Sequence, residues 1–171
     1  VSVEAGSRIA VDAPRTFSGA RWEVHRLSGS LTPFASRWDT LNERLYSGHP
    51  LLDSAFVGAL IRNFGDGEEH LCICSVGGVD VAMGIFRKRS AGVWSSFVPS
   101  QAQIGPVLLP DIDLLASLFG ALPGMANAIE LLCMDPRYGG ARLPRILPTT
   151  AVHHAVTMSR MHRLYGVTMG E

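Results

Sequence analysis

The chain has 171 residues, which is enough for one domain of ordinary size and short for two. Its fifteen basic and fifteen acidic residues cancel, so it lacks the charge excess of a nucleic-acid-binding or polybasic membrane-surface protein. Hydrophobic residues make up 47% and charged residues only 18%, against about 25% charged in typical soluble domains. This apolar excess predicts a surface that a second domain or a second copy of the chain covers.

Residues 1–20 show little periodicity and no signal-peptide core, so we expect a loose leader. The sequence also has no run of the ~20 apolar residues that would span a bilayer. Three cysteines, an odd number, argue against a secreted disulfide framework and favour a cytoplasmic protein. Cys72, Cys74 and Cys133 are expected to be small core residues. A metal site is the weaker interpretation, because no Cys-x-x-Cys pair is present.

The first elements are a strand and two helices. Trp22–Leu27 alternates apolar and polar residues, which predicts a half-buried strand. Apolar residues then follow at helical spacing, so residues 33–46 are expected to form an amphipathic helix with Thr32 as its N-cap. A second helix is expected over residues 53–64, with Asp53 at its start.

The hydrophobic period then changes to two. Residues 71–76 and 79–86 read as strands, and the Gly77-Gly78 connection suits a primed hairpin turn because both positions tolerate positive φ. A third strand is expected over residues 92–98. A third helix is then expected over residues 111–122.

The last part of the chain returns to strand character. The nearly continuous apolar run Ala128–Met134 predicts a central strand buried on both faces. Residues 135–148 read as a loop, residues 151–158 as a last strand and residues 159–171 as a tail. The fold class expected for residues 21–158 is therefore α/β (α+β), with a mixed, mainly antiparallel sheet flanked by helices.

Inward-facing apolar positions on these elements predict the hydrophobic core. Large aliphatic and aromatic side chains dominate it, as in most globular domains. The residues expected there are Trp38, Leu41, Phe56, Leu60, Ile73, Ile85, Leu115, Phe119, Leu131 and Cys133.

Several short stretches resemble one family. Trp38-Asp39-Thr40-Leu41, followed by residues 49–56, is similar to the opening of CelD/BcsL-type proteins, which are bacterial GNAT-like proteins of cellulose and exopolysaccharide biosynthesis. Residues 92–105 resemble the middle section of that family, and residues 135–138 also fit it. The order of elements resembles the opening of the GNAT acyltransferase fold, whose sheet splays between two strands to admit acyl-coenzyme A.

The resemblance implies more than this chain contains. Proteins of this family are longer and carry two GNAT-like halves, with the better-formed acyltransferase site in the second. The chain is therefore expected to be a fragment, or a shortened protein that has lost its partner half. The expected partner is a second GNAT-like half or a second copy of the chain. The implied cofactor is acetyl-coenzyme A or another acyl-coenzyme A.

The segment that the resemblance gives for coenzyme binding offers few groups that could bind a pyrophosphate. It runs over residues 100–106, ahead of the third helix. Pro106 and Pro110 lack the N–H donors that a pyrophosphate needs. Asp111 places a carboxylate at the helix start, where it competes with a phosphate. We therefore do not expect the coenzyme to bind tightly to this chain.

The candidate ligand-binding residues are Trp94, Ser100, Gln101, Gln103 and Gly105. An aromatic face beside amide side chains is typical of sites for sugars or other polar, uncharged ligands. The alternative is that Trp94 packs in the core and that the glutamines serve the loop backbone, and this alternative is favoured because most strand aromatics pack in cores.

Two residues at the end of the last apolar run are candidates for catalysis. Asp135 and Tyr138 would supply a base and an acid, since sites in α/β proteins gather at strand ends. The alternative is that Asp135-Pro136 forms only a turn.

Two functions follow from these observations. The first is an acyltransferase-family (GNAT-like) domain of polysaccharide or cell-surface glycoconjugate biosynthesis, the non-catalytic half of its protein. The second is a non-catalytic GNAT-like interaction or dimerisation module. Under both hypotheses this chain alone does not acylate a substrate.

Overall fold

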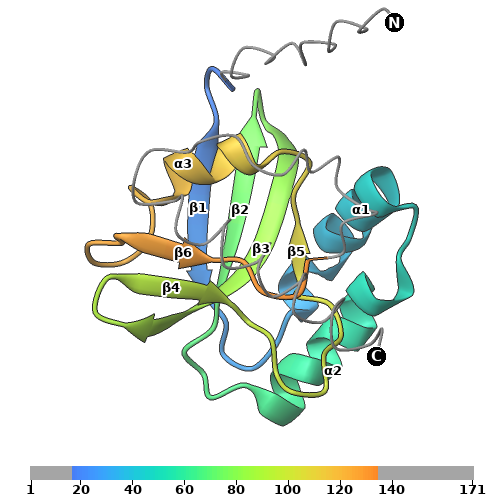
Figure 1. Cartoon of the computed structure of the whole chain (residues 1–171). Coiled ribbons are helices and arrows are strands. Elements are labelled where there is room, and N and C mark those ends of the chain that lie inside the picture. The colour runs from blue at the N-terminus through green and yellow to red at the C-terminus, as the bar shows by residue number, and fades with distance from the viewer. Residues whose placement is uncertain (1–16, 135–171) are drawn as a thin grey trace, which may run out of the picture.

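The structure is a computed structural model, and it describes residues 17–134 of the chain (Figure 1). The expected leader up to residue 16, the expected strand over residues 151–158 and the tail lie outside the described residues. So do the candidate catalytic residues Asp135 and Tyr138.

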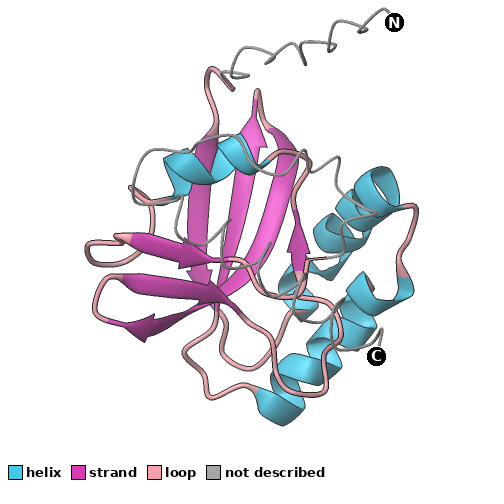
Figure 2. Ribbon diagram, viewed as in Figure 1, coloured by secondary structure: helices cyan, strands magenta, loops and turns pink. Residues whose placement is uncertain are grey.

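The described residues form a mixed α+β fold with a mainly antiparallel sheet, which confirms the expected fold class. Two helices follow the first strand, and a short third helix precedes the last strand (Figure 2). The strands are β1 (Arg21–Arg26), β2 (His70–Val76), β3 (Val79–Ser90), β4 (Val93–Ser96), β5 (Val107–Leu108) and β6 (Ala128–Glu130). The α-helices are α1 (Ala35–Tyr46), α2 (Ser54–Phe64) and α3 (Leu115–Leu118).

The strands lie in the order β1-β2-β3-β4-β6. β4 and β5 pair with different parts of β3, opposite Phe86–Ser90 and opposite Met83 and Gly84. The loop between them, residues 98–105, therefore leaves the sheet and returns to it. Among the described strands only β4 and β6 pair in parallel.

Each face of the sheet carries a hydrophobic cluster. Alternation along β2 sends Leu71 and Ile73 to the cluster under α1 and α2, and Cys72 and Cys74 to the cluster under α3. Most residues expected in the core are buried there. Phe56 and Phe119 are only partly buried, which corrects the expectation for both.

The connection between α1 and α2 is fixed by side chains of α1 and of the segment that joins the two helices. Trp38 is fully buried, and its indole Nε1 donates to the Leu52 carbonyl at 2.6 Å. Asp39 accepts from the Ser54 backbone N–H at 2.8 Å and from its hydroxyl at 2.6 Å. The Asp53 side chain caps α2 as expected. These residues therefore hold the two helices together.

The hairpin turn between β2 and β3 is also confirmed. Gly77 and Gly78 have φ of 58° and 80°, in the left-handed region that glycine adopts without strain. At the start of α1 the expectation was wrong in detail. Thr32 opens a 3-10 turn, Thr32–Phe34, and it is the Ser30 hydroxyl that accepts from the Thr32 N–H.

The third helix is shorter than the pattern predicts. Residues 111–122 form a 3-10 turn, Ile112–Leu114, followed by the four residues of α3. Gly120 lies two residues beyond the end of α3, and glycine costs a helix interior about 1 kcal/mol relative to alanine. The chain turns instead, with the N–H groups of Ala121 and Leu122 both bonded to the Leu118 carbonyl.

The last apolar run is not a central strand. β6 has three residues and ends the described sheet, next to β4. Leu132 then bonds the Ser96 side chain, and Cys133 has a φ of 53°, so the chain leaves the strand conformation. Cys133 is exposed, which corrects its place in the expected core, whereas Leu131 is buried.

Within residues 17–134 no helix has the length and apolar character needed to cross a membrane.

Candidate functional site

The parallel pair β4 and β6 marks the place where the GNAT resemblance puts the acyl-coenzyme A. Its register runs from Val93 opposite Ala128 to Ser95 opposite Glu130. Beyond the pair, Ser96 Oγ accepts from the Leu132 N–H at 2.8 Å. This hydrogen bond therefore holds the segment after β6 close to the end of β4.

Gly105 brings the 98–105 loop back against the end of β6. Its N–H donates to the Cys133 carbonyl at 2.9 Å. A Cβ at Gly105 would lie 2.5 Å from the Leu132 carbonyl oxygen and 3.2 Å from Val98 Cγ2. Glycine is required here for close packing of two backbone segments. The place between β4 and β6 is thus filled by protein.

The other candidate ligand-binding residues lie apart from one another. Trp94 is 2% exposed and belongs to the cluster under α3. Ser100, Gln101 and Gln103 are exposed on the 98–105 loop, whose Ala102 packs into the cluster under α1 and α2. The structure therefore does not bring the Trp94 ring to the two amides. Ser100 instead donates its hydroxyl to Gln101 Oε1 at 2.9 Å.

The start of the third helix carries its own negative charge. Asp111 Oδ1 accepts from the Asp113 N–H at 3.0 Å, as expected for a cap. The carbonyl of Pro106 accepts from the Ile85 N–H at 3.0 Å and ties the preceding segment to β3. A pyrophosphate at this turn would meet the Asp111 carboxylate.

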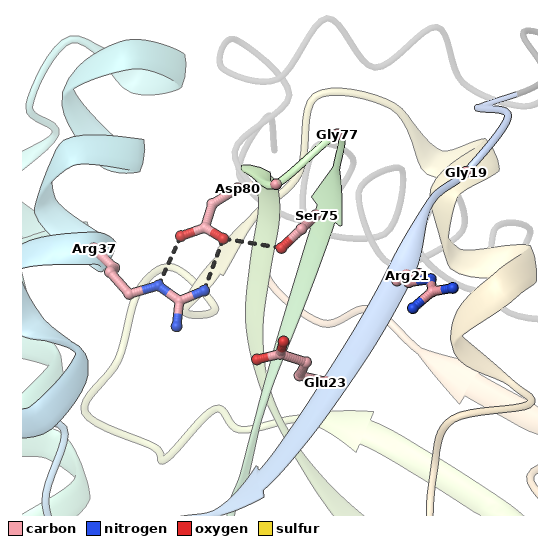
Figure 3. A pocket seen from close by; sticks show the side chains of 8 residues that line it. Gly19, Arg21, Glu23, Arg37, Ser75, Gly77 and Asp80 are labelled. Atoms are coloured by element: carbon pink, nitrogen blue, oxygen red, sulfur yellow. Dashed lines mark hydrogen bonds and ion pairs between the residues drawn. The ribbon is translucent and has the colours of Figure 1, made fainter.

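A polar cleft of about 420 Å³ lies elsewhere, on the sheet face beside α1 (Figure 3). Arg37 of α1 and Asp80 of β3 stand on one side of the cleft and Glu23 of β1 on the other, whereas the guanidinium of Arg21 is turned away from these three side chains (Figure 3). The residues that line it are Gly19, Arg21, Glu23, Arg37, Ser75, Gly77, Gly78 and Asp80.

Arg37 and Asp80 form a two-point ion pair. Arg37 Nε donates to Asp80 Oδ2 and Nη2 donates to Oδ1, each at 2.8 Å. Ser75 Oγ donates to the same Oδ1 at 3.1 Å, and Arg44 donates to the Asp80 carbonyl. The hydrogen bond with Arg37 lowers the pKa of Asp80, and the same bond raises the pKa of Arg37. The pair is ionised at neutral pH.

The local fold explains how these residues meet. The β2–β3 register shifts after Cys74, and this irregularity places Ser75 opposite Asp80. Sequence patterns did not identify this group, because Arg37 and Asp80 are 43 residues apart. The sequence held one weak signal for this site. Ser75 is a polar residue on the same face of β2 as the buried residues Leu71 and Ile73.

The cysteines are not arranged for chemistry. Burial raises the pKa of Cys72 to about 12 and that of Cys74 to about 11, so both thiols stay protonated at neutral pH. Among residues 17–134 no three His, Cys, Asp or Glu side chains come together as metal ligands.

Comparison with known proteins identifies no relative. No family model matches the chain, and neither the curated proteins nor the solved structures contain a match.

Proposed function

We propose that this chain is a GNAT-like domain of the acyltransferase lineage that does not bind acyl-coenzyme A tightly by itself. It would serve as the non-catalytic half of a cytoplasmic protein of polysaccharide or cell-surface glycoconjugate biosynthesis. The element order supports this proposal. Two helices follow the first strand, an antiparallel run of strands comes next, and a helix then leads to a strand parallel to β4. The resemblance implies this order.

One observation carries the non-catalytic part of the proposal, and it is the filled junction between β4 and β6. To admit a pantetheine chain, the bonds from Gly105 to Cys133 and from Leu132 to Ser96 would have to break. Each such bond contributes about 0.5–1.5 kcal/mol net, and the exposed polar groups would need new partners. In addition, Pro106 and Pro110 have no backbone N–H to donate to the pyrophosphate of the coenzyme.

Calorimetric titration of acetyl-coenzyme A and free coenzyme A into the full chain tests the proposal. We expect no saturable heat, which corresponds to a dissociation constant weaker than about 1 mM. An assay of free thiol release with amine and sugar acceptors is expected to stay at the rate without protein.

Tight binding would overturn the proposal. A dissociation constant in the low micromolar range that Gln103→Ala weakens, while Arg62→Gln on α2 does not, would place the coenzyme at the 98–105 loop. Both side chains are exposed, so both variants are expected to fold.

The second candidate function is that of an interaction or dimerisation module. The filled junction favours it equally. The exposed large hydrophobic side chains of the described residues are Phe64, Val79 and Met125, on three separate segments of the chain. Sedimentation velocity on the full chain, alone and co-expressed with a second GNAT-like half, distinguishes a homodimer from a paired half.

A further inference from the structure

The strand β1 lies at one end of the described sheet, with β2 on its inner side (Figure 1). It has six residues in an unbroken antiparallel register with β2, and it contains no proline, lysine or bulge. Proteins commonly use such features to protect the free edge of a sheet. The strand at the other end, β6, has only three residues and is protected by its shortness. β1 is therefore the edge to which a further strand could add.

The hydrogen bonds of β1 show which of its backbone groups point outward. The Leu27 N–H donates to the Glu69 carbonyl at 2.8 Å, in continuation of the β1–β2 register. Bonded residues alternate along an antiparallel pair, so the N–H and carbonyl groups of Trp22, Val24 and Arg26 point away from β2. Within residues 17–134 these outward groups make no hydrogen bond.

A second copy of β1 can satisfy all of these outward groups at once. With a twofold axis at Val24, perpendicular to the sheet, Val24 lies opposite Val24 of the second copy. Trp22 then lies opposite Arg26 of the second copy, and each of these pairs is a hydrogen-bonded pair. The axis keeps every side chain on its own face, so the two sheets join into one continuous sheet.

Neighbouring registers pair the strand with itself less well. An axis at Glu23 brings two carboxylates opposite each other, which is destabilising. An axis at His25 leaves Trp22 beyond the end of the second strand. An axis at Trp22 places Arg26 opposite the turn at residues 18–19. The register described first has none of these defects.

The side chains that meet in the first register are complementary. Glu23 lies opposite His25 of the second copy, at the closer spacing of a non-hydrogen-bonded pair, where an imidazole N–H can donate to the carboxylate. Val24 is partly buried against the cluster under α3, and Val24 of the second copy covers it further. α3 is bonded to the Trp22 end of β1 through Ser117 Oγ at 3.0 Å, so the two copies of α3 lie at opposite ends of the strand pair.

We propose that two copies of this chain associate through β1, which pairs antiparallel with itself about Val24. Backbone hydrogen bonds give the affinity and the opposed side chains set the register. The contact is narrower than a standard protein interface, so we expect a dissociation constant of about 10–500 μM. This inference names a surface for the second candidate function. It rests on β1 and not on the acyltransferase lineage.

Hydrogen exchange measured by NMR on the full chain tests the pairing, with sedimentation velocity at matched concentrations from about 10 μM to about 1 mM. The amides of Glu23 and His25 face β2 and are expected to be protected at every concentration. The amides of Trp22, Val24 and Arg26 are expected to exchange fast in the monomer. Their exchange should slow in proportion to the fraction of dimer.

A proline at the centre of the strand tests the outward N–H groups. Val24→Pro removes an N–H that β2 does not use, and proline is tolerated at such a position of an edge strand. We expect it to weaken dimerisation about tenfold or more, whereas Val24→Thr, which keeps the N–H and the branched shape, stays within about threefold of the parent. Protected amides at Glu23 and His25 show that Val24→Pro is folded.

A charge exchange tests the register without the proline. Glu23→Lys places an ammonium opposite His25 of the second copy, and symmetry repeats the change, so dimerisation is expected to weaken about tenfold. Adding His25→Glu places a carboxylate opposite each new ammonium and is expected to restore the dimer. The two side chains are 58% and 39% exposed, so both variants are expected to fold.

Four results would overturn the proposal. One is a chain that stays monomeric at about 1 mM. Another is a dimer whose outward amides still exchange as in the monomer, which would place the interface elsewhere. Protection of these amides at every concentration would mean that a segment outside residues 17–134 of the same chain pairs with β1. Failure of His25→Glu to restore the Glu23→Lys dimer would exclude the register. None of these results would change the coenzyme titration, so the two proposals fail independently.

Discussion

Asp80 illustrates how one carboxylate can hold several elements together. It joins α1 through Arg37 and β2 through Ser75, and its side chain is 21% exposed. Because the ion pair with Arg37 has two hydrogen bonds and is partly buried, it is stronger than a typical exposed pair.

The lowered pKa of Asp80 predicts a stability change in acid. The unfolded pKa is about 3.9, so the stabilisation by Asp80 is complete above that value and is lost as the pH falls through the lower folded pKa. Asp80→Asn is expected to cost about 1 kcal/mol at pH 6 and progressively less toward pH 2.5. Urea unfolding across this range measures the difference. Glu43→Gln on the exposed face of α1 is the control, and a constant gap for Asp80→Asn would contradict the prediction.

The three thiols are expected to differ in reactivity. Burial raises the pKa of all three thiols, but Cys72 and Cys74 are buried whereas Cys133 is exposed. With a thiol reagent such as dithiobis-nitrobenzoate at pH 8, Cys133 is expected to react first and the other two only on unfolding. Cys133→Ser should remove the fast phase. A fast phase that survives this substitution would show that the sheet opens locally at β2.

At the residue scale, the sequence predicted which side chains are buried better than it predicted which polar side chains contact each other. Trp38, Ile73 and Ile85 are buried as expected, since a large apolar side chain has few alternatives. Trp94 lies in the core, the alternative that its residue type favoured, but on the other side of the sheet from the loop with Gln101. Arg37 and Asp80 could not be paired, because polar contacts across the chain leave no periodic signal.

At the scale of elements, the α1–α2 connection depends on a buried amide. Asn42 is 3% exposed. Its Nδ2 donates to the His49 carbonyl and its Oδ1 accepts from the His49 N–H, each at 3.1 Å. The Asn42 side chain thus supplies the hydrogen-bond partner of both the backbone N–H and the backbone carbonyl of His49.

Asn42→Ala is therefore expected to destabilise the fold by about 1–3 kcal/mol, because buried polar groups lose their partner. Ser36→Ala on the exposed side of the same helix is expected to stay within about 0.5 kcal/mol of the parent. Equilibrium urea unfolding at pH 7 compares the two variants. Equal midpoints would mean that water replaces the Asn42 amide without cost.

Local patterns specified the elements that are long and amphipathic. α1, α2 and the β2–β3 hairpin follow from helical spacing, the Asp53 cap and two glycines. The third helix and β6 were overestimated, because an apolar run alone cannot show where hydrogen-bonded pairing ends. β6 ends where Leu132 bonds a serine hydroxyl from a segment 36 residues earlier in the chain.

At the scale of the whole molecule, the described sheet is closed where the resemblance expects it to open. The 98–105 loop returns to the sheet through Gly105, and this contact joins the segment before β5 to the segment after β6. The closure could not be inferred from the sequence, because a lone glycine in a loop indicates a turn as readily as a close backbone approach. In the structure the Leu132 carbonyl oxygen lies so near Gly105 that the glycine serves a close backbone approach.

Gly105→Ala is expected to destabilise the protein by about 1–3 kcal/mol, the usual cost of overpacking. The new methyl group would lie 2.5 Å from the Leu132 carbonyl oxygen, and a backbone atom cannot rotate away as a side chain does. Gly120→Ala is a matched control, because a Cβ at Gly120 would meet nothing within 4 Å and the φ of this residue is not positive. Gly120→Ala is expected to be neutral or to stabilise by about 0.4–1 kcal/mol. Thermal and urea unfolding of both variants measure the contrast, and hydrogen exchange at the amides of Gly105 and Leu132 reports whether the junction loosens. If Gly105→Ala were as stable as Gly120→Ala, with unchanged exchange at both amides, the two backbone segments would not be packed together, and the space between β4 and β6 would be open to a ligand.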